Sequence, residues 1–205
     1  MGGCVASVAL RAVSRSFAEI LESGEGFISF PGNMRKIMRF TIMILIVILP
    51  CLVLAATLTV KQDGSGDYTV IQTAIDAANP GDTVLVHPGR YYENITLQTS
   101  DITLMSLEGT TGYPAFIDST VIDGNSTNRC IEITQEGIVV RGFSLTRGAT
   151  NTSGGGILIS VNETTVYNCK IFDNEAAFGG GVALFDAAVY LAGVDIFDNY
   201  ALHQG

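Results

Sequence analysis

Tryptophan is absent from this sequence and histidine is nearly so, and both absences narrow the range of functions. The 205 residues hold two histidines, His87 and His203. These lie far apart in the chain, and neither stands in an HxxxH or HExxH pattern, which argues against a zinc site. The absence of tryptophan removes the largest flat aromatic surface on which a sugar ring could stack.

Basic residues are also few. The chain has 11 Lys or Arg against 20 Asp or Glu, a net charge of −9 at pH 7. From residue 57 onward 17 acidic residues face six basic ones, a net charge near −11; the six are Lys61, Arg90, Arg129, Arg141, Arg147 and Lys170. So acidic a segment argues against a nucleic-acid partner and against an anionic membrane surface. No motif predicts a cofactor.

An apolar run follows the first basic cluster of the chain. It extends over residues 40–56 without a charge, after Arg35, Lys36 and Arg39, and ends in small residues. This pattern predicts a secretory signal peptide over residues 34–56, starting at Met34, with residues 1–33 as an unstructured upstream extension. The alternative is an uncleaved membrane anchor, although the run is short for a span and is interrupted by Pro50. Export to the cell surface or the medium follows from either interpretation.

Only two cysteines, Cys130 and Cys169, follow the leader. They fall on different predicted strands, so a disulfide is possible but not favoured, and buried thiols are the expectation. Export also agrees with four N-glycosylation sequons, at Asn94, Asn125, Asn151 and Asn162.

The chain repeats two of its own motifs at one fixed interval. GGGILI begins at Gly154 and GGGVAL at Gly179, while IFDN begins at Ile171 and again at Ile196. A fainter copy precedes them, in CIEI from Cys130 and in GFSLTRG. Two motifs that return at the same interval predict a solenoid, in which a structural unit repeats along an axis.

Each repeat contains short β-rich runs separated by Asn, Asp and Gly, with no stretch of helical period. It therefore predicts about three short strands and three turns per coil. Stacked coils would pair each strand in parallel with its equivalent one coil later. The interval then places Ile171 on Ile196, Phe172 on Phe197, Asn174 on Asn199 and Val166 on Leu191. We expect the apolar stacks, the phenylalanines included, to fill the tube, and the glycine triplets to form tight corners.

From about Thr57 onward the sequence resembles the right-handed parallel β-helix proteins of the pectate-lyase-like superfamily. Its GGGI, GGGV and IFDN motifs are similar to the repeats of polymorphic outer-membrane proteins. The entry segment DGSGD, with Ile71-Gln72 and Tyr92-Glu93-Asn94, is similar to pectinesterases. The resemblance implies an all-β fold over residues 57–205, a right-handed parallel β-helix solenoid with a short N-terminal capping α-helix.

The capping helix can also be read from the residues. Thr69 and Gln72 form an S/T-x-x-E/Q capping box, and Asn79, Pro80 and Gly81 would end the helix. One apolar face is formed by Ile71, Ala74, Ile75 and Ala78. At the other end, the last residues, ALHQG, align with AAFGG one repeat earlier. The chain therefore stops in mid-motif, and we expect a solenoid truncated at its C-terminal end.

The sequence predicts no catalytic residues. Pectinesterases carry two Asp, two Gln and an Arg on coils where this chain holds Gly155, Gly156, Asn168 and Phe172. One weak metal candidate is the pair Asp173 and Asp198, which would stack one coil apart. A solvated turn is the competing interpretation and the one we favour, because Ca²⁺ requires six or more oxygens.

Two functions remain open. The first is an exported or cell-surface β-helix that binds glycan or serves as an adhesin or passenger-type module, without catalysis in this segment. The second is a polysaccharide-degrading enzyme, a lyase or hydrolase with catalytic coils beyond residue 205. We favour the first. A polysaccharide or cell-surface glycan is the expected partner, with no membrane contact beyond the leader.

Four tyrosines could stack on sugars from outside the tube: Tyr91, Tyr92, Tyr113 and Tyr190. Interior positions are nevertheless expected for most of them.

Overall fold

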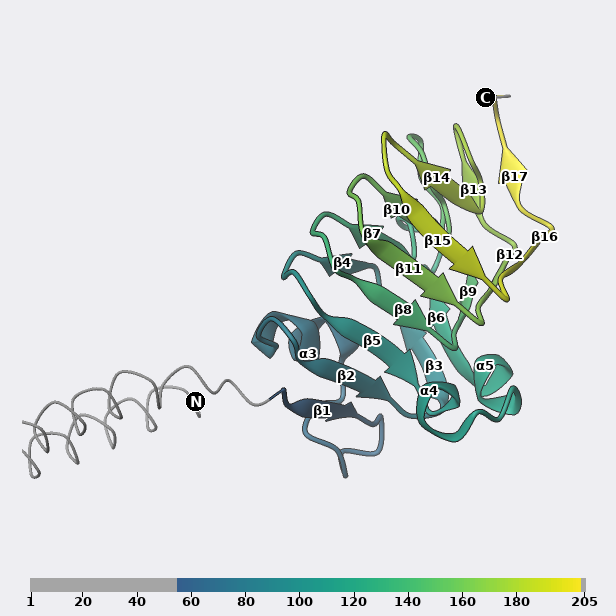
Figure 1. Cartoon of the computed structure of the whole chain (residues 1–205). Coiled ribbons are helices and arrows are strands. Elements are labelled where there is room, and N and C mark those ends of the chain that lie inside the picture. Colours follow the sequence, from purple (N-terminus) through teal and green to yellow (C-terminus); the bar gives the residue numbers. More distant parts are fainter. Residues whose placement is uncertain (1–54, 204–205) are drawn as a thin grey trace, which may run out of the picture. The chain divides into compact units, whose positions relative to one another are not determined.

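Residues 55–203, which the computed structural model describes, form a right-handed parallel β-helix and so confirm the fold class (Figure 1). The chain winds through three sheets, and every strand pair is parallel. The described part contains four complete three-strand coils, with one strand before them and a partial coil after them. The predicted extension over residues 1–33, and the predicted leader apart from residues 55–56, lie outside the described residues. No helix in the described part is long and apolar enough to cross a membrane.

The strands fall into three long sheets and one short one. The six-stranded sheet has the order β1 (Thr57–Val60), β2 (Thr83–Val86), β5 (Thr103–Ser106), β8 (Val139–Arg141), β11 (Thr164–Tyr167) and β15 (Val189–Ala192). The five-stranded sheet has the order β3 (Gly89–Tyr92), β6 (Thr120–Asp123), β9 (Ser144–Thr146), β12 (Lys170–Phe172) and β16 (Asp195–Phe197). The four-stranded sheet has the order β4 (Ile95–Leu97), β7 (Ile131–Ile133), β10 (Ile157–Ile159) and β14 (Val182–Leu184). A two-stranded sheet pairs β13 (Glu175–Ala176) with β17 (Tyr200–Ala201).

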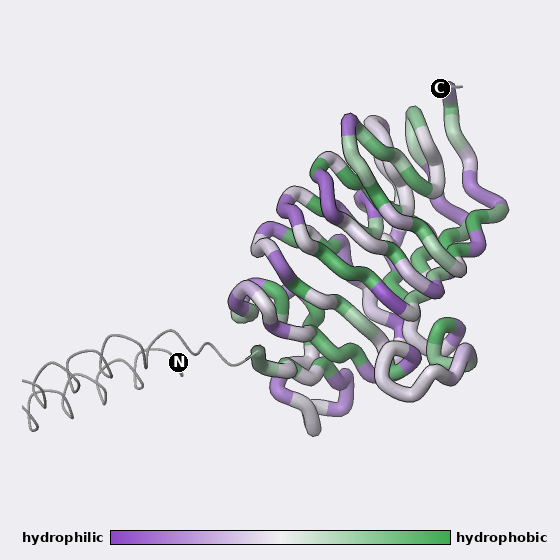
Figure 2. Tube along the Cα trace, viewed as in Figure 1, coloured by the Kyte–Doolittle hydropathy of each residue, from purple (hydrophilic) through white to green (hydrophobic). Residues whose placement is uncertain are grey.

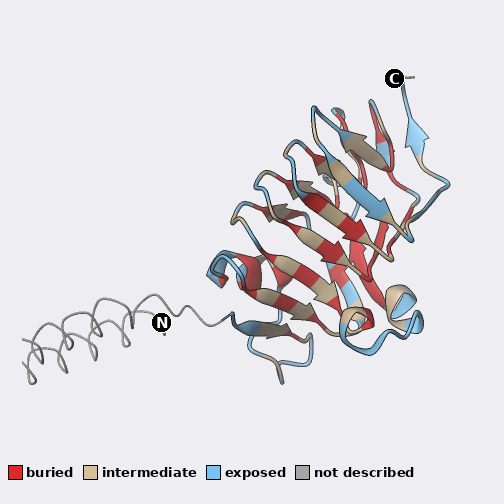
Figure 3. Cartoon of the chain, in the orientation of Figure 1, coloured by how far each residue is buried: buried red, intermediate tan, exposed pale blue. Residues whose placement is uncertain are grey.

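The predicted register is confirmed. Ile171 pairs with Ile196, Phe172 with Phe197, and Val166 with Leu191. Hydrophobic residues recur along the strands of every coil (Figure 2), and the buried ones form one continuous cluster from Val60 to Ile171. Burial decreases toward the last coil, where β16 and β17 are exposed throughout (Figure 3). Like residues therefore stack on like along the tube.

The predicted interior position of the two phenylalanines is wrong. Successive side chains of a strand point to opposite faces, and in β12 it is Ile171 that is fully buried. Phe172 is partly exposed on the outside, and Phe197 is 44% exposed. The error arises because both residues of the Ile-Phe pair are apolar, so hydrophobicity alone does not decide which one points inward.

The glycine triplets form corners where two coils approach closely, as predicted. A Cβ on Gly156 would lie 2.5 Å from the carbonyl oxygen of Gly181 in the next coil. Gly154 and Gly179, the first of each triplet, have φ of +69° and +56°, a region in which glycine is favoured. These corners therefore accept no side chain.

Asparagine forms a ladder at the corner that follows the five-stranded sheet. Asn174 is 1% exposed, and its Oδ1 accepts a hydrogen bond from the Gly148 amide at 2.8 Å. Its Nδ2 donates to the carbonyls of Leu145 and Phe172, and to Asn199 Oδ1 at 3.0 Å. The predicted stacking of Asn174 on Asn199 thus joins three successive coils through buried polar groups.

Helix α3 (Ile71–Ala77) covers the first coil, as predicted, with Ile71, Ala74 and Ile75 buried. The predicted capping box is wrong, because the N-cap is Val70 and no side chain of the helix start caps it. Glu93, from beyond β3, instead accepts hydrogen bonds from the Ile71 and Gln72 amides, each at 2.9 Å. The freed Gln72 side chain pairs with both backbone groups of Thr96, at the edge of the four-stranded sheet.

An insertion of two short helices, α4 (Glu108–Thr111) and α5 (Ala115–Ser119), stands between β5 and β6. It packs on the outside of the five-stranded sheet, where Ser144 Oγ donates to the Ile117 carbonyl at 3.0 Å. The Lys170 ammonium forms an ion pair with Asp118 of α5. The insertion therefore borders one side of this sheet's outer surface.

The two described cysteines, Cys130 and Cys169, are buried and free, as expected. Burial raises the pKa of the Cys130 thiol to about 12 and that of Cys169 to about 11. Neither thiol is therefore suited to act as a nucleophile near neutral pH.

Candidate functional site

Polar and aromatic side chains gather on the outer surface of the five-stranded sheet. Its strands place Tyr92, Asp123, Thr146, Phe172 and Phe197 in one outward column, because these residues pair across successive coils. A second outward position holds Arg90 on β3. We call this surface, together with Arg147 at its corner, the five-stranded face.

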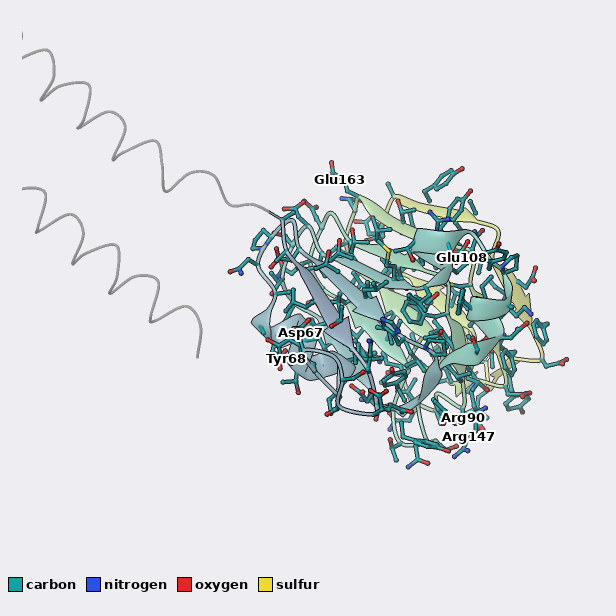
Figure 4. The ribbon with its side chains drawn as sticks, turned by 90° about the horizontal axis from the view of Figure 1, so that it is seen from below. Asp67, Tyr68, Arg90, Glu108, Arg147 and Glu163 are labelled. Carbon is teal, nitrogen blue, oxygen red and sulfur yellow. The ribbon has the colours of Figure 1, made fainter. Side chains whose placement is uncertain are left out.

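A buried carboxylate holds two arginines on this face. Asp123 has no exposed side-chain area, and its Oδ2 forms an ion pair with Arg90 Nη1. Its Oδ1 lies 3.5 Å from Arg147 Nε and accepts a hydrogen bond from the backbone N–H of Asn125 at 2.9 Å. Arg147 Nη2 also donates to Asn125 Oδ1 at 3.0 Å. Figure 4 shows Arg90 and Arg147 at the same side of the coil stack.

Both arginines keep much of their surface free. The side chain of Arg90 is 44% exposed and that of Arg147 is 45% exposed. A guanidinium has five N–H donors in a planar fork, so donors remain for a ligand after Asp123 is satisfied. One carboxylate is shared by two cations, although two further carboxylates continue the column of Arg147: its amide donates to the Asp173 carbonyl at 3.1 Å, and the Asp173 amide donates to Asp198 one coil later.

A stacked pair of aromatic rings continues the face along the coil axis. The rings of Phe172 and Phe197 stack with centroids 5.2 Å apart and an angle of 3° between their planes. At the other end of the column, Tyr92 is 61% exposed. Because the two rings face each other along the coil axis, the pair presents its ring edges outward as a small apolar contact surface.

Of the four tyrosines considered for sugar stacking, only Tyr91 takes the interior position expected for most of them. It is 2% exposed and donates a hydrogen bond to the His87 carbonyl at 2.9 Å, and burial raises its pKa to about 12. Tyr92, Tyr113 and Tyr190 are each more than half exposed, so for these the expectation is wrong. Strand alternation places Tyr92 and Tyr190 outside, and Tyr113 belongs to the exposed insertion.

A second charged cluster lies at the corner after the six-stranded sheet. Glu108 is 2% exposed and accepts hydrogen bonds from Arg141 Nε at 2.9 Å and Asn168 Nδ2 at 2.8 Å. The Arg141 guanidinium lies over the Tyr167 ring, 5.1 Å from its centroid. Hydrogen bonding from Arg141, opposed by burial, lowers the pKa of Glu108. Its groups bond to one another, so this cluster ties the insertion to the coils.

The predicted metal pair, Asp173 and Asp198, stands one coil apart in the same corner. Both residues have positive φ, 53° and 52°, and the Asp173 amide donates to the Asp198 carbonyl at 3.2 Å. In the described part of the chain no three His, Cys, Asp or Glu side chains come together as metal ligands. The backbone geometry explains why a residue tolerant of the left-handed region stands here, and the metal pair stays a prediction.

The histidines lie at opposite ends of the described coils. His87 follows β2 and lines a pocket with Lys61. His203 follows β17, and its ring lies 5.1 Å from that of Phe178. The structure does not bring the two together.

No protein-family model matches the sequence, and no curated protein sequence matches it significantly. Among solved structures, a pectin methylesterase from carrot is similar at a TM-score of 0.46 and 20% identity, covering 69% of this chain and 52% of that one. Pectin methylesterase from Aspergillus niger is similar at a TM-score of 0.46 and 16% identity, covering 68% of this chain and 56% of that one. The chain thus spans about half the length of these structures.

The sequence alone does not identify Arg90, Asp123 and Arg147 as a group. Their spacings do not match the interval of the repeated motifs, because the coils that hold Arg90 and Asp123 differ in length from the last ones. One feature of the sequence could have pointed to this group. Basic residues are few from residue 57 onward, so each of their positions is a candidate for binding an acidic ligand. Three of the six, Arg90, Arg147 and Lys170, lie on the five-stranded face or next to it.

Proposed function

We propose that this chain is an exported or cell-surface β-helix protein that binds an acidic polysaccharide along its five-stranded face. The observation that carries the proposal is the pair of half-exposed arginines on the buried Asp123, in line with the stacked Phe172 and Phe197 rings. Catalysis is not part of the proposal.

The chemistry of the face favours a ligand with carboxylates on sugar rings. Guanidinium groups bind carboxylates in a bidentate manner, and the exposed edges of the stacked Phe172 and Phe197 rings offer apolar contact to a sugar. Adjacent strands repeat about every 4.8 Å, so the face offers regularly spaced contacts to a repeating polymer. The net charge near −11 of the segment from residue 57 onward would repel an acidic chain, so binding is expected only where the basic residues gather.

The proposal can be tested by measuring binding of the purified protein to polygalacturonate and to neutral dextran, by calorimetry or by retardation in affinity gels. We expect binding to polygalacturonate and none to dextran. Arg90→Gln and Arg147→Gln should each weaken binding by at least about tenfold, because a hydrogen bond to a charged group contributes about 1.5–3 kcal/mol. Rising salt should weaken it as well.

Arg129→Gln is the control, because Arg129 forms an ion pair with Glu132 of the four-stranded sheet and its side chain is only 12% exposed, so it offers little surface to a polymer. It should leave binding unchanged. Equal losses in all three variants would mean that overall charge, and not this face, binds the polymer. Binding to dextran as tight as to polygalacturonate would contradict the acidic ligand.

The alternative function is catalysis on a polysaccharide, which the buried Asp123 carboxylate between two arginines favours. General acid–base chemistry needs a second titratable group near the first. Asp123 is bonded only to Arg90, Arg147 and the Asn125 amide within the described residues. We therefore expect no methanol and no unsaturated product from pectin or polygalacturonate, with or without Ca²⁺. Turnover that Asp123→Asn abolishes would favour the enzyme.

A further inference from the structure

A pocket of about 340 Å³ opens at the corner between the six-stranded and five-stranded sheets, near the start of the coil stack. We call it the corner pocket; it is lined by Lys61, Gln62, Asp63, His87 and Pro88. Pro88 immediately precedes β3, so the pocket lies directly beside Arg90 on the five-stranded face. It is a continuation of that face toward its N-terminal edge.

The walls of the corner pocket are fixed by hydrogen bonds to the coil. Gln62 Nε2 donates to the Arg90 carbonyl at 2.7 Å, and the His87 amide donates to the Val60 carbonyl at 3.0 Å. Gly89 leaves room for this arrangement, because a Cβ there would lie 2.7 Å from Gln62 Oε1. A pocket whose walls are held before a ligand arrives loses little entropy on binding.

Protonation of His87 would make the pocket positively charged. Lys61 and His87 supply nitrogen donors, and the Asp63 carboxylate, whose pKa is lowered by its hydrogen bonds from Ser65, balances the charge of Lys61 while His87 is neutral. The charged groups that influence the His87 imidazole are Lys61 and Asp63, both from the loop after β1. The Tyr91 phenol donates a hydrogen bond to the His87 backbone carbonyl. Partial burial and the Lys61 ammonium hold the pKa of His87 below its usual value, and Asp63 opposes them.

We propose that the corner pocket is a subsite for the carboxylate of a sugar, and that His87 takes up a proton when this carboxylate binds. The subsite rests on the proposed function, since it would receive the end of a polysaccharide that lies on the five-stranded face. Lys61 provides the permanent positive charge, and the protonated His87 provides the second.

The proposal fixes the direction of the pH dependence. In the free protein His87 is neutral at pH 7, because its pKa is lowered. A bound carboxylate stabilises the imidazolium, so the pKa of His87 rises on binding, and affinity must increase as the pH falls through that pKa. A rise of one pKa unit corresponds to about tenfold tighter binding at low pH than at high pH.

The test is an NMR titration of the imidazole signals of the purified protein between about pH 5 and pH 8, with D-glucuronate, with D-glucose and without sugar. His203 serves as the internal control, and His203→Gln assigns the two signals. We expect D-glucuronate to raise the pKa of His87 and leave that of His203 unchanged, with no effect of D-glucose. Lys61→Gln should reduce the shift.

An unchanged His87 pKa in D-glucuronate, or an equal change in D-glucose or at His203, overturns the subsite. This outcome is independent of the polymer experiment. If polygalacturonate binding depends on Arg90 while His87 does not respond, the proposed function stands and the subsite fails. If His87 responds while polymer binding does not depend on Arg90 or Arg147, the pocket binds the sugar but the five-stranded face does not bind the polymer.

Discussion

Replacing Asn174 by alanine removes a side chain that bonds to buried backbone groups on two adjacent coils. Its Oδ1 is the acceptor for the Gly148 amide at 2.8 Å, and its Nδ2 bonds to the carbonyls of Leu145 and Phe172 at 3.1 and 3.0 Å. Asn174 is 1% exposed, so water cannot easily take its place. The substitution leaves the Gly148 N–H without a partner in the interior.

The magnitude follows from these bonds. A buried donor without a partner costs about 1–3 kcal/mol, and each of the other bonds contributes about 1 kcal/mol. We therefore expect Asn174→Ala to lower the free energy of unfolding by about 4 kcal/mol, a large share of the stability of a typical domain. Urea denaturation followed by circular dichroism should show a lower midpoint with an unchanged slope.

Asn199→Ala is the matched control, one coil further on. Asn199 bonds in the same way, with Nδ2 donating to the Ile171 and Phe197 carbonyls and Oδ1 accepting from the Asn174 backbone amide at 3.1 Å, but it lies on the last described coil and is partly exposed. Water can replace part of these bonds, so the loss should be smaller, about 2 kcal/mol. Equal losses for the two variants would refute the argument, because burial of the ladder would then not determine its contribution.

Three further predictions concern stability. Ile171→Asp should cost on the order of 4 kcal/mol and Phe172→Asp about 1 kcal/mol, measured by urea denaturation, since only the first places a charge inside the tube; the reverse order would mean that the side chains face the other way. Asp173→Ala should cost about 1 kcal/mol and Asp173→Gly close to nothing, because the residue has a φ of 53°; thermal melting compares the two. The lowered pKa of Glu108 contributes stability that is present above its unfolded value and lost as the pH falls below about 4. Glu108→Gln should therefore remove part of the acid destabilisation, which unfolding curves at neutral and acid pH would detect.

The sequence predicted the coil and its register because the motifs repeat. Ile171 and Ile196 stand in identical contexts one repeat apart, and parallel stacking leaves one way to pair them. The direction of each side chain was not predictable in the same way, since Ile and Phe are adjacent and both apolar. The predicted capping box was wrong for a different reason. The acceptor for the first amides of the helix is Glu93, which comes from the following coil.

The proximity of the residues of the candidate site could not be predicted from the sequence, because it depends on coil lengths that differ. Thr103 pairs with Thr83 one short coil earlier, whereas Val139 pairs with Thr103 across a much longer coil that contains the insertion. No repeat therefore aligns the first coils, and the approach of Arg90 and Arg147 to Asp123 depends on the register of those coils. Composition showed only that basic residues are scarce.

The α4–α5 insertion shows where this architecture tolerates change. It lengthens one coil, yet Leu104 still pairs with Val140 and Ile122 with Leu145 on either side of it. An added segment at a corner perturbs neither the hydrogen-bond ladder nor the core, whereas one extra residue within a strand would turn every following side chain to the opposite face. The corner between β5 and β6 is therefore the position at which a foreign peptide or a reporter tag can be introduced into this protein with the least effect on its folding.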